Sequence, residues 1–570
     1  MTDGASVEAA YAELHCHSYF SLLDGVSSPE ALVARAVELG LTALALTDHD
    51  SLAGAVRFWL AARRAGLHAI CGAEVTLEDG RHLTLLAENQ AGYANLCKLI
   101  TVSRLDALLA QWQPDAPDAA APANSAALAA HWPGKTDPAL RWERLAAHQA
   151  GLIALTGCRR GVVAAPLLRG DTIAARQALG QLQEIFGGDR LLIELQHHNL
   201  PDDDRMLRGL LGLAQRTGLP VVATHNAHYA TIAHSQLRDV LSAVGQNLSL
   251  VNARRSGHLP LNDTYALPAP AAMAQRFAQR PDALANAVAL AARCQVSLDF
   301  SNRRLPIFEL PAQETPFQFL YELCHRRLPE CYPALQPLVL KQLAHELEVI
   351  EQAGLAGYFL IVWDIVRFAR EQGIRCQGRG SAANSIVAYL LGITSVDPLA
   401  HNLLFERFLS SDKFTMPDID IDFAADRREE VIQYVYRKYG RAHTAMVCNV
   451  VTYQARSALR DLGKVLELPE ETVEHLQGLL DTNAPDAAAD TLEQHALPAL
   501  HKLTEDAFPS PATLIALLRQ IDGCPRHLSI HSGGMLITGP PLDEVVPWSR
   551  RRCRGALSAS GIRTVWRMPG

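Results

Sequence analysis

The chain has 570 residues, with 52 Lys and Arg against 60 Asp and Glu, a formal net charge of −8, and 49% hydrophobic residues. This length exceeds what one hydrophobic core supports, so we expect three or more domains. No apolar run approaches the roughly 18 residues that span a bilayer, which argues against an integral membrane protein. The N-terminal segment has no basic region followed by an apolar core, so we expect a soluble, cytoplasmic protein.

The eleven cysteines are scattered without a single C-x-x-C pair. This spacing indicates reduced thiols and excludes a disulfide framework or a cysteine zinc cluster. The negative net charge disfavours binding of a partner that is rich in phosphate. In a protein that holds metal ions, however, many of the Asp and Glu residues belong to the metal sites. The net charge is therefore weak evidence against phosphate-bearing substrates.

Residues 11–110 alternate short apolar runs such as LTALALTD and HAICGAEV with helical patterns such as SPEALVARAVELG. Residues 113–137 are rich in Ala, Pro, Asp and Asn and are expected to form an inserted loop. Apolar runs resume at LIALTG, LLIELQHH and PVVATHNAHY, with helical patterns between them. Repeated β-α units are predicted, and with them an α/β architecture.

Side chains that bind metals recur where these predicted strands end. They are His15 and His17 in LHCHS, Asp48, His49 and Asp50 in LTDHD, Glu74 in GAEV, and His225 and His228 in THNAHY. In a β-α barrel or a related fold, the carboxyl ends of strands gather at one site, so ligands far apart in the sequence converge there. The alternative for each single histidine is an ordinary hydrogen-bonded side chain.

This order resembles the PHP (polymerase and histidinol phosphatase) domain, which has H-x-H, a DH pair, a Glu, further His or Cys, and a closing D-x-H. The resemblance implies a site for up to three ions of the Zn²⁺, Mn²⁺ or Fe²⁺ kind, and phosphoesterase or 3′ to 5′ exonuclease activity. The chain departs from the family at Asn226, where Asp is usual. The implied ligands are His15, His17, Asp24, His49, Glu74, His82, Cys158, Asn226 and His228.

From about residue 270 to 373 the pattern is helical, as in LVLKQLAHELEVIEQAG, and GRGSAANS follows at residues 378–385. The small residues predict a turn that opens into the apolar helix SIVAYLLG. Backbone N–H groups at such a helix start attract phosphate oxygens. Ordinary helix entry is the alternative.

The run FTMPDIDIDF, residues 414–423, places Asp418, Asp420 and Asp422 at alternate positions. Alternation predicts a strand with the three carboxylates on one face and the apolar side chains in a core. Carboxylates two residues apart lie about 7 Å from each other, where they repel by roughly 2 kcal/mol at an effective dielectric of 20. A pair of Mg²⁺ ions would offset this repulsion. A solvated edge strand is the alternative.

Together these segments resemble the C-family bacterial DNA polymerases, the family of the DNA polymerase III alpha subunit, from about residue 11 to residue 547. The resemblance implies that Asp418 and Asp420 bind two Mg²⁺ ions and that Gly380 and Ser381 contact the incoming triphosphate. Asp422 is not a ligand in the family pattern. Arg379 and Arg407 are candidate phosphate partners, because their guanidinium forks match phosphate oxygens.

The run PRHLSIHSGGMLITGPPLDEVVP, residues 525–547, resembles the error-prone branch of this family through His527, His531, Gly533 and Gly534. The resemblance implies an N-terminal PHP (β/α) barrel-like domain followed by a mixed α+β palm with a helical thumb insertion. Arg456, Arg460 and Lys464 in the thumb would contact the DNA backbone, or form a solvated helix face. The expected domains are PHP at 1–270, palm at 271–450, thumb at 451–523, palm continuation at 524–547 and an aberrant Arg-rich tail at 548–570.

The tail after Pro547 contains six arginines and no acidic residue. A shift of reading frame is the preferred interpretation, and a basic tail that binds nucleic acid is the alternative. The family pattern continues to a third catalytic Asp, preceded by a Lys, and neither is found. We therefore expect this chain alone to be impaired as a polymerase.

The function implied is that of an error-prone DNA-directed DNA polymerase in damage-induced mutagenesis and translesion synthesis. It would add deoxynucleoside triphosphates to a DNA primer-template by two-metal phosphoryl transfer, and would meet the sliding clamp and mutasome proteins through regions that this sequence lacks. One alternative is a metal-dependent PHP phosphoesterase with a polymerase remnant. A second is a non-catalytic subunit that binds DNA.

Overall fold

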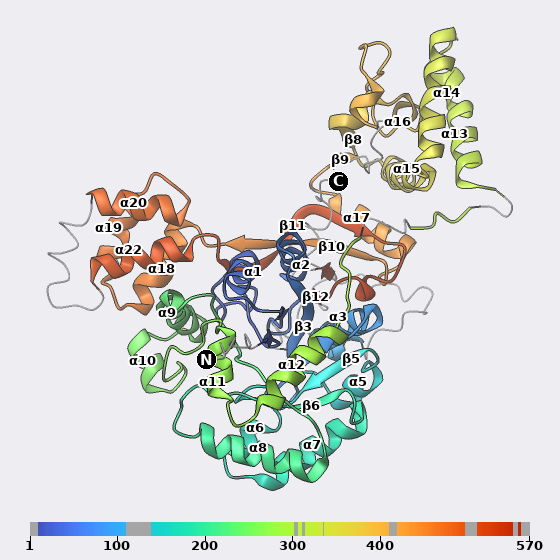
Figure 1. Ribbon diagram of the computed structural model, residues 1–570. Coiled ribbons are helices and arrows are strands. Elements are labelled where there is room, and N and C mark those ends of the chain that lie inside the picture. The colour runs from blue at the N-terminus through green and yellow to red at the C-terminus, as the bar shows by residue number, and fades with distance from the viewer. Residues whose placement is uncertain are drawn as a thin grey trace, which may run out of the picture. The chain divides into compact units, whose positions relative to one another are not determined.

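The computed structural model describes residues 10–109, 138–300, 306–310, 314–334, 336–409, 419–495, 510–550 and 557–559. The chain divides into two units (Figure 1). The first consists of Met1–Phe300, Met446–Gly534 and Asp543–Gly570, and the second of Ser301–Ala445 and Met535–Leu542. The insertion predicted at 113–137 and most of the Arg-rich tail lie outside the described residues.

Seven strands of the first unit form one curled sheet whose order follows the chain. Neighbours are parallel except around β4, which is antiparallel to both β3 and β5. Beyond β1 and β7, a parallel bridge joins Cys16 to Ala227, so the two edge strands meet at their carboxyl ends. The strands are β1 (Ala12–Glu13), β2 (Ala43–Leu46), β3 (His68–Thr76), β4 (His82–Ala87), β5 (Leu152–Leu155), β6 (Leu191–Leu195) and β7 (Val221–Ala223).

Helices cover this sheet because each presents an apolar stripe to it. The first, α1 (Pro29–Glu38), begins at Ser28, whose side chain accepts a hydrogen bond from the Ala31 N–H, and has a proline in its first turn. The predicted boundary after residue 270 falls inside the first unit, because α12 (Pro281–Arg293) packs on β7 and β1. The other helices include α2 (Ala55–Ala65), α3 (Gln90–Leu109), α5 (Trp142–Ala147), α6 (Ala164–Leu168), α7 (Thr172–Phe186), α8 (Asp203–Thr217) and α11 (Pro270–Arg276).

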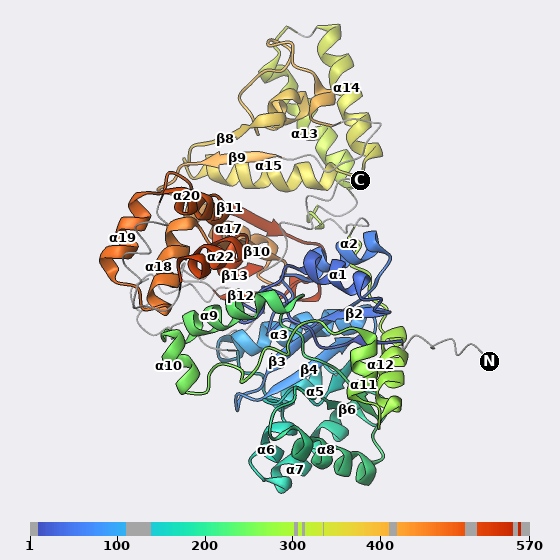
Figure 2. The ribbon, with the colours of Figure 1, turned by 60° about the vertical axis from the view of Figure 1, so that its left-hand side comes forward.

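A second apolar cluster in the first unit joins helices that are far apart in the sequence (Figure 2). Helix α9 (Ser235–Gln246) packs on α18 (Ala455–Val465) and α22 (Pro511–Ile521), and α10 (Leu250–Arg255) packs on α9. Helices α19 (Glu470–Gly478) and α20 (Pro485–His495) complete the group. The helical character expected of residues 451–523 is confirmed in α18, α19, α20 and α22, and Arg456, Arg460 and Lys464 are exposed on α18.

A four-stranded sheet has the order β11-β10-β13-β12. Strand β10 (Thr444–Thr452) pairs in parallel with β13 (Leu557–Ala559), and β13 pairs in antiparallel with β12 (Trp548–Arg550). Strand β11 is Pro525–Ile537. In it, His531 Nδ1 accepts the N–H groups of Gly533 and Gly534 at 3.1 and 2.6 Å. His531 therefore accepts two backbone donors of the glycine pair within β11, which accounts for this histidine without a nucleotide.

The second unit packs helices around a short antiparallel pair, β8 (Cys376–Arg379) and β9 (Asp420–Phe423). The buried carboxylate of Asp364 on α15 accepts the hydroxyls of Tyr434 and Tyr439 at 2.7 and 3.1 Å, which fixes α17 to α15. The helices of this unit are α13 (Pro316–Cys331), α14 (Pro337–Gln352), α15 (Ala356–Glu371), α16 (Ile386–Leu390) and α17 (Arg428–Tyr439).

Among the described helices, none alone has the length and hydropathy needed to cross a membrane. Helices α14 and α15 reach that threshold only as a pair, and they are bent by 112° at the break between them.

Candidate metal centre and candidate nucleotide site

All nine residues predicted as metal ligands lie in the first unit and are described by the structure. Most come from near the carboxyl ends of parallel strands and the loops that follow, whereas His82 begins β4, whose antiparallel direction brings its amino end to the same edge. Most are linked through contacts of side-chain atoms or rings: His15, His17, His49 and His82 surround Glu74, Asp24 joins His49 to His228, Cys158 lies 3.7 Å from His82, and His17 stacks on His228. Asn226 is buried in the same loop as His228.

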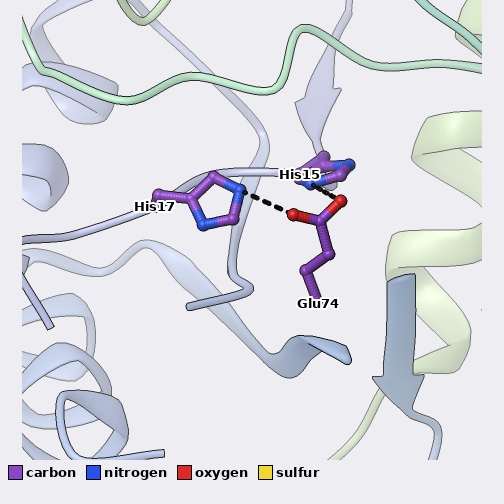
Figure 3. A group of neighbouring side chains, drawn as sticks. All are labelled: His15, His17 and Glu74. Atoms are coloured by element: carbon purple, nitrogen blue, oxygen red, sulfur yellow. Dashed lines mark ion pairs between the residues drawn. The ribbon is translucent and has the colours of Figure 1, made fainter. Parts of the chain in front are cut away.

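Glu74 is the centre of this cluster and is 1% exposed. Its carboxylate lies 3.5 Å from His15 Nε2, 3.6 Å from His17 Nε2, 3.0 Å from His49 Nδ1 and 3.2 Å from His82 Nδ1. Figure 3 shows one oxygen directed toward His15 and the other toward His17. Neither oxygen has a hydrogen-bond partner. A buried carboxylate ringed by imidazoles matches the ligand preference of Zn²⁺, Mn²⁺ and Fe²⁺.

The far nitrogens of His15 and His17 are occupied, which fixes the direction of their lone pairs. His15 Nδ1 donates to the buried carboxylate of Glu194 at 2.7 Å. His17 Nδ1 donates to Ser21 Oγ at 2.9 Å, and Ser21 Oγ in turn donates to Asp48. Both Nε2 atoms therefore face Glu74 without a hydrogen-bond partner. Two ring nitrogens and a carboxylate that converge in this way offer ligand atoms to a cation, so these residues fit a metal ion.

The pKa values of the cluster follow from burial and from this arrangement. Burial alone would lower the pKa of His15, but Glu194 and Glu74 raise it to about 10. Burial alone would raise the pKa of Glu74, but His82, His49 and His15 hold it well below its usual range. Burial, reinforced by His49 and His228, holds the pKa of His17 well below its usual range. Glu74 is therefore charged and His17 neutral, which are the states that bind metals, whereas His15 holds a proton that it would release when an ion binds.

Asp24 organises the other end of the cluster, which also contains His228 and Asn226. Its Oδ2 lies 3.1 Å from His49 Nε2 and 3.3 Å from His228 Nδ1, and its Oδ1 accepts from Arg238. Asn226 adopts a left-handed backbone conformation with φ 53°, and its buried side-chain oxygen has no hydrogen-bond partner. This end of the site therefore contains one carboxylate and one neutral amide.

Sequence reasoning missed Glu194 and Glu13, two glutamates buried in β6 and β1. A glutamate in an apolar strand is costly without a partner, so LLIELQHH carried a signal that was not used. Glu13 accepts the N–H groups of His15 and His225 and the hydroxyl of Tyr11, and burial raises its pKa to about 7. His225, predicted as a strand-end histidine, directs its ring Nδ1 to Arg276 at 2.7 Å and not to the cluster.

Replacing Glu194 by glutamine is expected to weaken Zn²⁺ binding by about 10–100-fold, because the carboxylate that orients His15 and strengthens its Nε2 as a ligand is lost. Competition with a chromophoric chelator measures this affinity. Glu184, an exposed residue of α7, provides the matched control, and Glu184→Gln should bind as the wild type does. Equal affinities for all three proteins would contradict the role of Glu194.

In the second unit, strand pairing places Asp420 opposite Arg379, next to the Gly380 turn. Arg379 Nη1 lies 3.3 Å from Asp420 Oδ2, and its Nε lies 3.2 Å from Asp422 Oδ1. Asp420 and Asp422 are 47% and 68% exposed, whereas Ile421 is partly buried and packs against the apolar core of this unit. The alternation predicted for this strand is confirmed over Asp420–Phe423. Asp418 lies outside the described residues. The positive charge that offsets the two described carboxylates in this structure is Arg379.

The turn that follows β8 is the 3-10 helix η2 (Gly380–Asn384), and Gly380 enters it with φ +67°. Glycine is also required at Gly378, because a Cβ there would lie 2.6 Å from the Ile393 carbonyl oxygen. Arg407 is exposed at the end of η3 (Phe405–Arg407), which contacts η2. Gly380, Ser381, Arg379 and Arg407 thus lie on adjoining elements.

The expectation of a phosphate cradle at the start of the apolar helix is wrong. Glu346, buried on α14, accepts the Ser385 hydroxyl at 2.7 Å and the N–H groups of Ile386 and Val387 at 3.0 and 3.2 Å. The Ser385 side chain accepts the Ala388 N–H. A carboxylate of this chain therefore occupies the N-terminus of α16, a helix of only five residues. The turn at Gly380, before the helix, remains the candidate for the phosphate contact.

Replacing Glu346 by alanine is expected to destabilise the second unit by about 3 kcal/mol, because three buried donors lose their acceptor. Burial raises the pKa of Glu346, and a hydrogen bond from Gln342 together with these donors offsets part of that effect. Urea unfolding measures the change. Glu348 is exposed on the same helix, and Glu348→Ala should stay within about 0.5 kcal/mol of the wild type. Equal losses from both variants would contradict this assignment.

The curled sheet and its buried histidine and carboxylate cluster define a PHP domain, and the family model of that domain matches residues 13–198. The model described as the bacterial DNA polymerase III alpha NTPase domain matches residues 318–566. Residues 318–566 are therefore similar to the bacterial DNA polymerase III alpha family. The predicted family and the barrel-like N-terminal domain are confirmed.

Two relatives are called error-prone DNA polymerase. The chain is 41% identical over 545 residues to that of Symbiobacterium thermophilum, which covers 94% of this chain and 48% of the relative. It is 42% identical over 558 residues to that of Cutibacterium acnes, with coverage of 96% and 46%. The chain thus spans about half the length of these curated relatives. The similarity to the error-prone branch predicted from residues 525–547 is confirmed.

One solved structure, an amidohydrolase from Chromobacterium violaceum, covers 38% of this chain and 88% of its own. Its 22% identity and TM-score of 0.25 are too low to support an argument about fold or function.

Proposed function

We propose that this chain provides the PHP domain and the nucleotide-binding part of an error-prone DNA-directed DNA polymerase that acts in damage-induced mutagenesis and translesion synthesis. The observation that carries the proposal is the register of β8 and β9, which sets Asp420 directly beside the Gly380 turn. The Asp420 carboxylate, which can bind a cation, then lies next to the Gly380 turn, which can bind phosphate. The similarity to error-prone polymerases supports the same reading.

In the proposed reaction the primer 3′-hydroxyl oxygen forms a bond to the α-phosphorus of a deoxynucleoside triphosphate, and pyrophosphate leaves. Asp418 and Asp420 would hold Mg²⁺, whose contribution is to activate the hydroxyl and to neutralise the triphosphate. Arg379 now pairs with Asp420 and Asp422. Once a cation replaces it there, its guanidinium is free to bind phosphate oxygens, together with Arg407 and the turn of Gly380 and Ser381.

The test is binding of dATP in the presence of Mg²⁺, followed by primer extension with the same samples. We expect Mg²⁺-dependent binding of dATP to this chain, and binding lost on Asp420→Ala. Templated incorporation abolished by Asp420→Ala would add catalysis to the proposal. Binding of dATP that is independent of both Mg²⁺ and Asp420 would refute it.

A second function is favoured by the cluster around Glu74: metal-dependent hydrolysis of phosphate esters, including 3′ to 5′ exonuclease activity. Water would attack phosphorus and the ester oxygen would leave with a proton, while the cluster orients the phosphate. Hydrolysis of nitrophenyl phosphate with Mn²⁺ should be lost in His15→Ala and retained in Asp420→Ala. Activity unaffected by His15→Ala would exclude the cluster as its source.

The remaining partners follow from this proposal. The PHP cluster would hold Zn²⁺, Mn²⁺ or Fe²⁺, and the palm would hold Mg²⁺. The exposed face of Arg456, Arg460 and Lys464 would contact the backbone of the primer-template. The sliding clamp, mutasome proteins and a cytoplasmic location belong to the same proposal, as do the palm and thumb boundaries predicted from the sequence. DNA binding without any turnover would favour the non-catalytic alternative.

A further inference from the structure

An arginine lies among the proposed metal ligands of the PHP cluster. Arg238, on α9, has a side chain that is 11% exposed, and its Nε and Nη2 donate to Asp24 Oδ1 at 3.2 and 3.0 Å. The guanidinium lies over the Tyr265 ring, 5.3 Å from its centre, and its buried Nη1 has no hydrogen-bond partner. The packing around Arg238 thus holds its positively charged guanidinium against the carboxylate of Asp24.

The charges at this end of the cluster leave little attraction for a divalent cation. Asp24 is its carboxylate, and Arg238 already neutralises it at hydrogen-bond distance. Asn226, where the family pattern has Asp, supplies an oxygen but no charge. A cation held by Asp24, Asn226 and His228 would lie close to the guanidinium and be repelled by it.

The other end of the cluster has the opposite balance. Two groups have ligand atoms close enough together to hold an ion: His15, His17 and Glu74, and His49, Glu74 and His82. The ion pairs of Glu74 are all with histidines. Each group combines two imidazoles with an oxygen of the same carboxylate, so Glu74 is placed to bridge two ions.

We propose that this PHP cluster is a two-metal site bridged by Glu74, in which the guanidinium of Arg238 takes the place of a third ion. The inference rests on the proposal that the cluster binds metal, and adds the number of ions and the residue that limits it. Asp24 then acts on His49 and not on an ion: its Oδ2 contacts His49 Nε2, which directs Nδ1 of the same ring toward Glu74, while Oδ1 is committed to Arg238.

The number of Mn²⁺ ions retained per chain tests the proposal. The full chain is loaded with Mn²⁺, desalted, and measured by elemental analysis and native mass spectrometry. Ions of the cluster are those lost in the double variant Asp24→Asn, Glu74→Gln, which removes a carboxylate from each end of the cluster. Two ions support the inference. Three ions, or one, overturn it while leaving metal binding in place. No retained ion overturns the metal proposal itself.

A variant that is expected to bind one more ion than the wild type provides a second test, because a folding defect would reduce the number of bound ions and not increase it. The double variant Asn226→Asp, Arg238→Met restores the carboxylate and removes the guanidinium, and it should retain a third ion. Arg254→Met is the matched control, because Arg254 is an exposed arginine of α10 paired with Asp239, and it should retain two. A folded double variant, judged by circular dichroism, that still retains two ions would overturn the role of Arg238.

Discussion

Replacing Glu74 by glutamine is expected to abolish the stabilisation that metal ions give the PHP domain. An ion present at 100 times its dissociation constant stabilises the folded state by about 2.7 kcal/mol. For a domain of this size that corresponds to a rise of about 5–10 °C in the melting temperature. We expect EDTA to lower the first melting transition of the wild type by this amount and to leave Glu74→Gln unchanged.

The physical reason is that Glu74 is the carboxylate shared by both groups of ligands. An amide in its place keeps the shape but removes the charge that holds the cations. Glu78, which lies outside the cluster, is the control, and Glu78→Gln should respond to EDTA as the wild type does. A wild-type transition that EDTA does not move, with metal content confirmed at loading, would show that the cluster does not couple metal to stability.

Replacing Asp420 by asparagine is expected to weaken binding of Mg²⁺ and dATP by about 100-fold, or about 2.7 kcal/mol. The carboxylate is half exposed beside the Gly380 turn and faces Arg379, so its loss removes the ligand and leaves the arginine with Asp422. Isothermal titration of dATP into the chain, with and without Mg²⁺, measures the change.

Asp422→Asn is the matched control, since Asp422 lies on the same strand and shares the partner Arg379. It should change the affinity by less than about threefold, because its own predicted role is that of an exposed acid and not of a ligand. Equal losses of affinity in the two variants would show that the two carboxylates act through their ion pairs with Arg379 and not by binding a cation.

The parts of both sites that the sequence predicts are those encoded locally. Alternation placed the carboxylates of Asp420 and Asp422 on one face, and the recurrence of ligands at strand ends located the cluster around Glu74. These inferences depend only on the periods of strands and on where parallel strands end.

The parts that the sequence did not predict depend on residues distant in the chain. Glu346 lies on α14, 39 residues before Ser385, and nothing in GRGSAANS signals that a carboxylate already occupies the helix start. Arg379 and Arg238 were visible as residues, but their pairing with Asp420 and Asp24 follows from strand register and helix packing. Sequence motifs therefore identified the candidate ligands but not the groups that compete with cations for them.

The position of the nucleotide cation is the central claim, and anomalous diffraction at the manganese edge, from crystals of the chain soaked with MnCl₂ and dATP, tests it directly. The account predicts a manganese peak at coordinating distance from the Asp420 carboxylate, with the triphosphate on the turn of Gly380 and Ser381. Bound dATP whose manganese lies elsewhere, with Arg379 still paired to Asp420, would contradict it.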